Sequence, residues 1–214
     1  TPPPAQSAKM RKYPAAPHPF VLEPESRGGR LVRGANHALG LILIGRGNRY
    51  LPGLIHALEQ AGAQGVGAGR GRLSLERIEQ MDSRDSRWID IYRPGRTCEP
   101  LPAVTPPIPA PPAQVRIRLE TPLRLKREGA IAGVKDFAFG ALFANLLRRI
   151  SMLTYFHTDT PLETDFSGLT RAARDVSYTD ANLRWFDWTR YSSRQQREMV
   201  LGGLLGEFTL DGGD

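Results

Sequence analysis

Cysteine is almost missing from this chain of 214 residues, in which Cys98 is the single example. One cysteine excludes an internal disulfide framework and a zinc cluster built on cysteines. Long apolar runs are also missing, because no stretch reaches the roughly 18 residues that a membrane-spanning helix needs. The first twenty residues lack the apolar segment of a secretory signal. We therefore expect a cytoplasmic protein without a membrane partner.

Lysine is scarce, so arginine supplies most of the positive charge. Lysine and arginine together number 29 against 22 acidic residues, which gives a formal net charge of +7 and a pI of about 10.0. This balance favours polyanionic partners, nucleic acid first, and arginine suits bidentate phosphate contacts and base stacking. On charge alone, a basic protein without such a partner remains the alternative.

The first part of the chain, residues 1–93, predicts an arm followed by a strand–helix–strand unit. Prolines dominate the beginning, and apolar residues then recur first in a short continuous run and next at helical spacing. The predicted elements are an extended arm over 1–30, a strand over 39–44, a helix from Leu51 to Gly62, a glycine-rich loop over 65–72 and a strand from Leu73 to Ile78.

A linker and a second domain follow. Residues 94–113 contain so many prolines that neither a helix nor a central strand is possible, which predicts a semi-rigid spacer. Residues 114–214 alternate apolar and basic residues, then show a wide apolar stripe at helical spacing. The predicted elements are strands over 115–119 and 123–127, a helix over 139–153 with Asp136 as its N-cap, a short helix over 166–173, and strands over 183–191 and 199–210.

These element orders predict an α+β fold with tandem ferredoxin-like (RRM-like) domains. A ferredoxin-like domain runs βαββαβ. The first part of the chain matches its closing βαβ portion and the second part its opening βαββ portion, so we expect each domain to be incomplete at a chain end.

The glycine-rich loop and a basic strand are candidate phosphate contacts. Alternate glycines at Gly65, Gly67, Gly69 and Gly71 let a phosphate approach main-chain N–H groups, with Arg70 and Arg72 between and beside them. An ordinary helix-to-strand connection explains the loop equally well. The basic strand residues are Arg116, Arg118, Arg124, Lys126 and Arg127. They form either a phosphate-tracking stripe or the solvated face of a sheet.

Aromatic residues interleave with arginines in a third cluster, formed by Trp185, Trp188, Arg190, Tyr191, Arg194 and Arg197. Rings and guanidinium planes of this kind suit the unstacked bases of single-stranded RNA. The alternative places both tryptophans in the core or at a sheet edge.

The four histidines, His18, His37, His56 and His157, show no metal-ligand spacing, so we predict no metal site and no cofactor. His157 follows the long helix and is a catalytic candidate, although a lone histidine is more often structural. Neither a GxSxG nor an HExxH motif occurs.

Several stretches together resemble the CRISPR-associated precursor-crRNA-processing endoribonucleases of the RAMP superfamily. They are GVGAGRGRLSL, TPLRLKREG, the FANLLRRISMLTYFH helix and WTRYSSRQQREMVLGGLLGEFTL, of which Ser192 to Glu207 is the most specific. The resemblance covers roughly residues 19–210. It implies tandem ferredoxin-like domains and one metal-independent cut per repeat RNA hairpin. In that reaction the RNA 2′-hydroxyl attacks the adjacent phosphate, often with a histidine as base.

Family members usually carry a further strand–helix–strand portion before residue 19. They also continue beyond a position like Asp214 into a final helix and glycine-rich loop, and their catalytic histidine commonly lies in one of these pieces. The resemblance therefore favours RNA binding over cleavage for this chain, with Arg124, Lys126, Arg190, Tyr191 and Arg194 as RNA contacts and His157 as the candidate base.

Three functions stay open at this point. The first is an endoribonuclease of CRISPR RNA maturation. The second is a non-catalytic RNA-binding RAMP subunit that works with other subunits of a CRISPR effector complex. The third is a ferredoxin-like domain that binds a small nucleotide through its glycine-rich loop.

Overall fold

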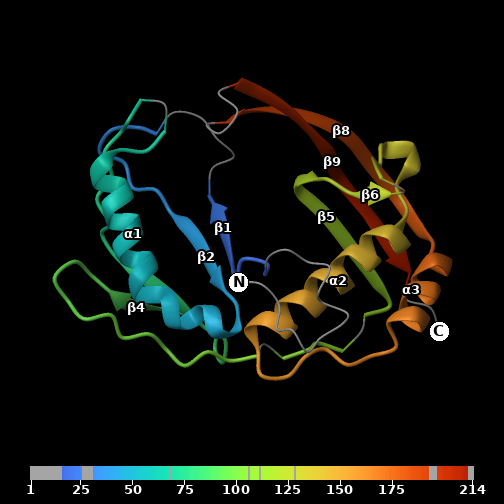
Figure 1. Ribbon diagram of the computed structural model, residues 1–214, viewed down its shortest axis with the longest axis horizontal. Coiled ribbons are helices and arrows are strands. Elements are labelled where there is room, and N and C mark those ends of the chain that lie inside the picture. Colours follow the sequence, from blue (N-terminus) through green and yellow to red (C-terminus); the bar gives the residue numbers. More distant parts are fainter. Residues whose placement is uncertain are drawn as a thin grey trace. The chain divides into compact units, whose positions relative to one another are not determined.

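The chain combines helices with small antiparallel sheets in the computed structural model, which confirms the predicted α+β class (Figure 1). The structure describes residues 16–25, 31–67, 69–105, 107–110, 112–127, 129–192 and 197–211. Two compact units form: the first comprises Thr1–Ile108 and Met152–Pro161, and the second comprises Pro109–Ser151 and Leu162–Asp214.

The first unit contains two separate pairs of antiparallel strands and one long helix. Its elements are β1 (Phe20–Pro24), β2 (Leu39–Leu43), the 3-10 helix η1 (Gly45–Tyr50), α1 (Leu51–Gln64), β3 (Ile78–Asp82) and β4 (Arg87–Tyr92). β1 pairs with β2, and β3 pairs with β4. The hydroxyl of Tyr92 donates to the Glu59 carboxylate at 2.7 Å, which ties β4 to α1.

Two predictions for this unit are wrong. Within the predicted arm over 1–30, residues 20–24 form β1, because their apolar residues pair with β2 in register, with Val21 opposite Ile42. The predicted strand from Leu73 to Ile78 is absent, since the main chain over 72–77 joins no strand and β3 begins at Ile78. The Leu73 N–H donates instead to the Gly62 carbonyl at 3.0 Å, so this segment is held by the end of α1.

The helix α1 is confirmed but ends later than predicted. Gly62 lies inside it and is buried. A Cβ at Gly62 would fall 2.5 Å from the Leu73 carbonyl oxygen, so a close approach of two backbones explains this glycine. The helix ends at Gly65, whose φ of +96° suits a glycine C-cap.

The second unit contains a three-stranded antiparallel sheet with two helices. Its elements are β5 (Gln114–Leu123), β6 (Lys126–Arg127), β7 (Ala130–Ile131), the 3-10 helix η2 (Val134–Asp136), α2 (Phe139–His157), α3 (Phe166–Asp175), β8 (Tyr178–Ser192) and β9 (Arg197–Asp211). The last turn and a half of α2, from Met152 onward, groups with the first unit. None of the described helices is both long and apolar enough to cross a bilayer.

The topology of this unit is strand, helices, strand, strand, with the last strand in the middle. The sheet order is β5–β9–β8, and both neighbouring pairs are antiparallel. This is the arrangement predicted for the opening portion of a ferredoxin-like domain. β8 and β9 are both longer than the predicted strands over 183–191 and 199–210. β5 continues through Pro122 because its pairing with β9 is irregular between Leu119 and Leu123.

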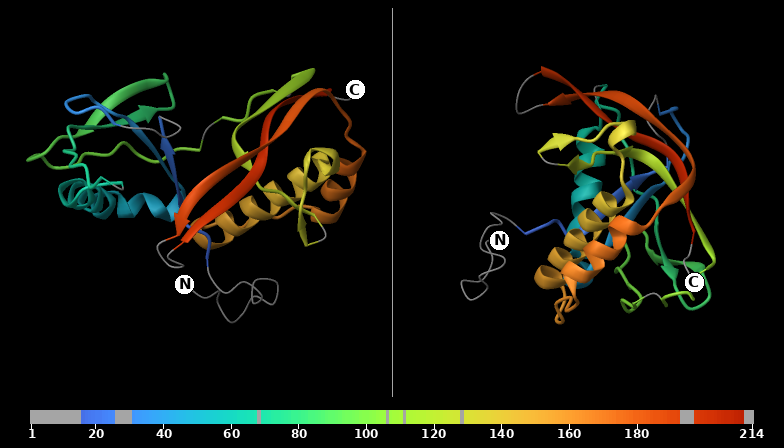
Figure 2. Two further views of the ribbon diagram at one scale, coloured as in Figure 1. Left: turned by 90° about the horizontal axis from the view of Figure 1, so that it is seen from above. Right: turned by 90° about the vertical axis from the view of Figure 1, so that its right-hand side faces the viewer.

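The core of the second unit lies between this sheet and α2. Leu204 and Phe208 of β9 are fully buried, together with Leu125, and Leu142 of α2 packs into the same cluster. The rings of Phe137 and Tyr178 contact Phe208 at centroid distances of 5.0 and 5.5 Å. Figure 2 shows α2 and α3 on one side of the sheet. The sheet therefore has a core face, packed on the helices, and an opposite face.

One predicted helix cap is wrong. Asp136 ends η2, and α2 begins three residues later at Phe139. The Asp136 carboxylate accepts a hydrogen bond from the Gly133 N–H at 3.4 Å, so it closes the turn of η2 rather than the start of α2.

Candidate nucleic-acid interface

Alternation along the strands divides the side chains of the β5–β9–β8 sheet between two faces. Leu204 and Phe208 mark the core face, and their immediate neighbours along β9 point the other way. We call this second side the outer face. Its residues are Arg116 and Arg118 of β5, Leu201, Gly203, Leu205, Glu207 and Thr209 of β9, and Arg184, Phe186 and Trp188 of β8.

Three arginines of the outer face are exposed. Arg116 lies opposite Thr209, and among the described residues it makes no ion pair. Arg118 lies opposite Glu207, and its Nε is 3.4 Å from the Glu207 carboxylate. This pair is largely solvated and contributes little to stability. Arg184 lies opposite Leu205 on the other edge strand. The face thus carries more positive than negative charge among these residues.

Two partly exposed aromatic rings lie on β8, on the same strand and face as Arg184. Phe186 is 38% exposed and Trp188 is 39% exposed. The guanidinium carbon of Arg184 lies 5.7 Å from the centroid of the Phe186 ring, within the range of a cation–π contact. Phe186 lies opposite Gly203, which carries no side chain, and Trp188 lies opposite Leu201. The described contact between an arginine and a ring is thus made by Arg184 and Phe186, which the sequence prediction missed, and Trp188 lies two residues further along the same face.

Trp185 belongs to the core-face side of β8, so the structure separates the two predicted tryptophans. Residues three apart in a strand point to opposite faces. Trp185 lies against Gly202 of β9, and its Nε1 donates to the Asp187 carboxylate at 2.8 Å. Because Trp185 is 40% exposed, it lies at the margin of the core rather than within it. A strict two-residue count along the predicted strand would have shown this separation.

The glycines of the LGGLLGE stretch make room for neighbours on both sides of β9. A Cβ on Gly202 would overlap the Trp185 ring, and one on Gly203 would lie 2.8 Å from Pro122. Gly206 has a φ of +122°, and a Cβ there would overlap the Asn182 carbonyl oxygen. The motif that carries the family resemblance is thus explained by close packing of the three strands.

The remaining basic residues predicted in this half are distributed differently. Arg124 follows β5, and its guanidinium donates to the Gly202 carbonyl at 3.1 Å, which gives it a structural contact. Lys126 is exposed on β6, opposite Ile131. Arg190 and Tyr191 lie on β8, paired with Met199 and Glu198. The side chains of Arg127, Arg190 and Tyr191, and the whole of Arg194, lie outside the described residues.

The glycine-rich loop of the first unit is closed on itself. The N–H groups of Val66 and Gly71 donate to each other's carbonyls at 2.8 and 3.1 Å, and the Arg70 N–H donates to the Gly67 carbonyl at 3.2 Å. The Gly65 N–H is used in capping α1. These N–H groups are therefore not free to bind a phosphate, in contrast to the prediction. Arg70 and Arg72 are exposed, and Gly69 has open space around its Cα.

His157 lies at the last position of α2 and is half-buried. Its Nε2 lies 2.7 Å from the carbonyl oxygen of Pro17. A carbonyl only accepts, so Nε2 carries the proton in this contact. Proton acceptance by this histidine would then fall to Nδ1. The backbone carbonyl of His157 lies against Gly45, so close that a Cβ at residue 45 would overlap the carbonyl oxygen.

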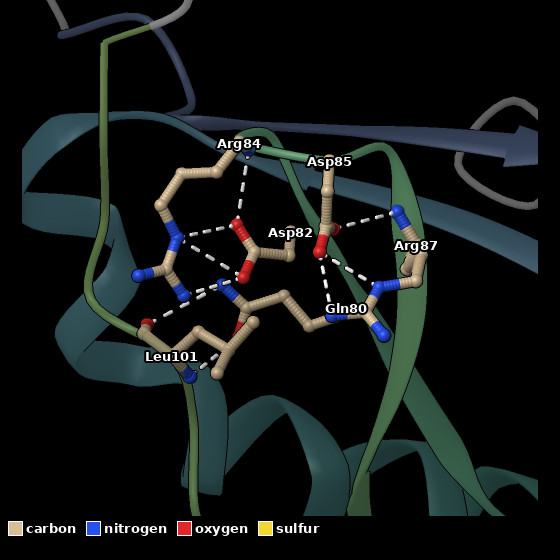
Figure 3. Close-up of polar contacts among 6 residues, drawn as sticks. All are labelled: Gln80, Asp82, Arg84, Asp85, Arg87 and Leu101. Atoms are coloured by element: carbon tan, nitrogen blue, oxygen red, sulfur yellow. Dashed lines mark hydrogen bonds and ion pairs between the residues drawn. The ribbon is translucent and has the colours of Figure 1, made fainter.

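A charged turn that the sequence prediction missed joins β3 to β4. Asp82 is buried, and its carboxylate accepts hydrogen bonds from the Arg84 backbone N–H at 3.0 Å and from the Arg84 guanidinium (Figure 3). These hydrogen bonds lower the pKa of Asp82 to about 2. Asp85 and Arg87 form a second ion pair at 2.6 Å. The repeated DSRDSR sequence, in which each aspartate precedes an arginine by two residues, was a sequence signal for these two ion pairs.

Comparison with family models gives a match for the part of the chain that carries the outer face. Residues 117–214 match the family model of the CRISPR-associated endoribonuclease Cas6. This part of the chain is a Cas6-family domain. The resemblance drawn from the sequence is thereby confirmed, and the match to an endoribonuclease family supports a nuclease.

The Cas6 match contains every described residue of the outer face except Arg116, which immediately precedes it. Residues 1–104 match a different family model, AF_1859_N, described as an N-terminal domain. No curated protein and no solved structure matches the chain significantly.

Proposed function

We propose that this chain binds CRISPR repeat RNA and cuts precursor crRNA without a metal ion. The observation that carries the RNA-binding part is the outer face, where Arg116, Arg118 and Arg184 are exposed on a Cas6-family sheet that also carries two partly exposed rings. A formal net charge of +7 adds a long-range attraction for a polyanion. We place this reaction in the cytoplasm.

The proposed cut transfers the phosphoryl group within the RNA. A base removes the proton of a ribose 2′-hydroxyl, and that oxygen attacks the adjacent phosphorus. The bond from phosphorus to the 5′-oxygen breaks, and this oxygen takes up a proton. The products are a 2′,3′-cyclic phosphate and a 5′-hydroxyl. Guanidinium groups next to the phosphate stabilise the additional negative charge of the transition state.

His157 is the base candidate, and its hydrogen bond restricts how it can act. Because Nε2 donates to Pro17, the imidazole would accept the proton at Nδ1. We test this with His157→Ala in the full-length protein, and with His56→Ala as the matched control, because His56 is an exposed histidine on α1. If His157 is the base, its variant loses the cut and the control keeps it.

A second function is favoured by the same contact. A histidine held by a backbone carbonyl is typical of a structural role, and it supports a non-catalytic RNA-binding RAMP subunit that works with other CRISPR subunits. In that case the full-length protein binds repeat RNA tightly and leaves it intact.

The deciding experiment incubates the full-length protein with a repeat RNA hairpin in EDTA. The proposal expects one cut per repeat. The upstream fragment should carry a 2′,3′-cyclic phosphate at its 3′ end. An RNA with 2′-deoxy sugars throughout the repeat should bind and stay uncut, because the attacking hydroxyl is missing. Cleavage of that deoxy substrate, or cleavage that requires added Mg²⁺, would contradict the mechanism. Binding without any cut would select the second function.

A further inference from the structure

We propose that the outer face binds an unpaired segment of the RNA, with two successive bases stacked on Phe186 and Trp188. This inference rests on the proposed function, since it assumes that the chain binds repeat RNA. It adds which part of that RNA the Cas6 domain takes, and which side chains select it.

The spacing of the two rings is the first argument. Phe186 and Trp188 are two residues apart on one face of a regular strand, where each residue advances about 3.3 Å, so their Cα atoms lie about 6.6 Å apart along β8. Neighbouring bases of a paired stem are only about 3.4 Å apart along the helix axis. Successive bases can lie on both rings only when they are separated from each other, which a paired stem does not allow.

The surroundings of the rings are the second argument. Phe186 lies opposite Gly203, and Pro122 of β5 lies only 2.8 Å from the Cβ position of Gly203, so the neighbour of this ring across β9 is the apolar Pro122. The ring itself is 38% exposed. A flat base can therefore stack on the exposed part of the Phe186 ring, beside an apolar neighbour. Stacking of bases on such rings does not depend on the base identity, because every base has a π-face.

The position of the charges is the third argument. Arg184 lies on the same strand, two residues before Phe186, and its guanidinium is already held over the Phe186 ring at 5.7 Å. A nucleotide whose base stacks on that ring would bring the phosphate on its ribose close to Arg184. Arg116 and Arg118 continue the positive charge to the opposite edge strand. Rings on β8 and arginines on both edges give the strand of RNA a path across the sheet.

The test compares two RNA probes of equal length, an unstructured single strand and a fully paired duplex. Their binding to the full-length protein is measured by titration at fixed salt. We expect the double variant F186L/W188L to lose affinity for the single strand by between about fivefold and about 160-fold for each ring removed. Its affinity for the duplex should change by less than about twofold. The matched control is Trp88→Leu, because Trp88 is a more exposed tryptophan on β4 of the first unit.

Conservative variants separate stacking from folding. The double variant F186Y/W188F keeps both rings and should retain single-strand affinity, whereas F186L/W188L should lose it, with equal melting temperatures for the two. Equal losses for single strand and duplex, or an equal loss in the Trp88 control, would overturn the inference. The proposed function fails in a different way, namely when the wild-type protein neither binds nor cuts repeat RNA.

Discussion

The ring of Trp185 lies against the backbone of Gly202 on the neighbouring strand, in the space that a Cβ at residue 202 would occupy. The same residue accepts a hydrogen bond at its carbonyl from the Arg124 guanidinium at 3.1 Å. One glycine thus joins β8, β9 and the segment after β5. The most specific stretch of the sequence is accounted for by packing, while the proposed RNA contacts lie on the other side of the sheet.

Gly202→Ala is expected to destabilise the second unit because its Cβ would overlap the indole ring of Trp185. Overpacking of this kind costs roughly 1–3 kcal/mol in the free energy of unfolding. The measurement is urea unfolding of four proteins: wild type, each single variant and G202A/W185A. Without the ring, Gly202→Ala should lower the free energy of unfolding by less, because the effects of substitutions at neighbouring residues are not additive. An identical cost of the alanine with and without Trp185 would contradict this explanation.

Gly206→Ala should be more harmful than Gly202→Ala. Gly206 has a φ of +122°, which side-chain-bearing residues rarely adopt, and its Cβ would also overlap a backbone carbonyl that cannot rotate away. Backbone strain and overpacking together are expected to cost about 2–5 kcal/mol. Thermal unfolding measures this loss. Gly53→Ala is the control, because nothing lies within 4 Å of its Cβ position on α1, and it should leave stability equal or slightly higher.

The ion pair of Asp82 with Arg84 predicts a loss of stability in acid. The pKa of Asp82 is lowered from 3.8 to about 2 by the Arg84 hydrogen bonds. A carboxyl group with a depressed pKa contributes stability that is complete above its unfolded-state pKa of about 4, and that disappears as the pH falls toward 2. Asp82→Asn should remove this pH dependence. The direct measurement is an NMR titration of the Asp82 carboxyl group between pH 1.5 and 6.

Arg84→Ala gives the corresponding control for this titration. Without the guanidinium, the midpoint of the Asp82 titration should move up toward 3.8, its ordinary value. The Asp85–Arg87 pair is left in place, so a shift reports on Arg84 alone. An unchanged midpoint in Arg84→Ala would show that another group lowers the pKa.

Arg184→Ala should weaken RNA binding in a salt-dependent way. If Arg184 contacts one phosphate, its removal should reduce the slope of log affinity against log salt by about 0.7 for a single strand. Arg171→Ala changes the net charge equally, but Arg171 lies on α3, on the helical side of the same unit. Its salt slope should stay that of the wild type. A similar change in both variants would indicate that only net charge matters.

Regular periodicity made much of the second unit predictable. The apolar stripe over 139–153 predicts α2, alternation predicts β8 and β9, and the order of these elements predicts the opening portion of a ferredoxin-like domain. These patterns are local, and burial on one side enforces them. The extent of each strand was less predictable, because some residues at the strand ends, such as Arg197 and Glu198 of β9, are exposed and continue no apolar alternation.

The first unit was harder to predict, for identifiable reasons. β3 and β4 are rich in charge, and the turn between them contains no glycine, with Ser86 taking a φ of +57° instead. The DSRDSR repeat was a sequence signal for the ion pairs of this turn, but not for the two strands that the turn joins. The glycine-rich loop has the composition of a phosphate cradle, but hydrogen bonds between Val66 and Gly71 use the donors that a phosphate would need. Composition alone cannot reveal where such hydrogen bonds go.

The position of β9 also has a consequence for how the second unit forms during synthesis. Of the three described strands of this sheet, β9 lies in the middle but leaves the ribosome after the other two, and Gln114 meets Asp211 across 97 positions of sequence. Until then β5 and β8 have no common partner, and their apolar residues stay accessible to aggregation or to chaperones. Closure of so long a loop is slow compared with helix formation. Stalled translation within β9 should therefore leave a nascent chain that is sensitive to protease, and completion of this strand should make it resistant.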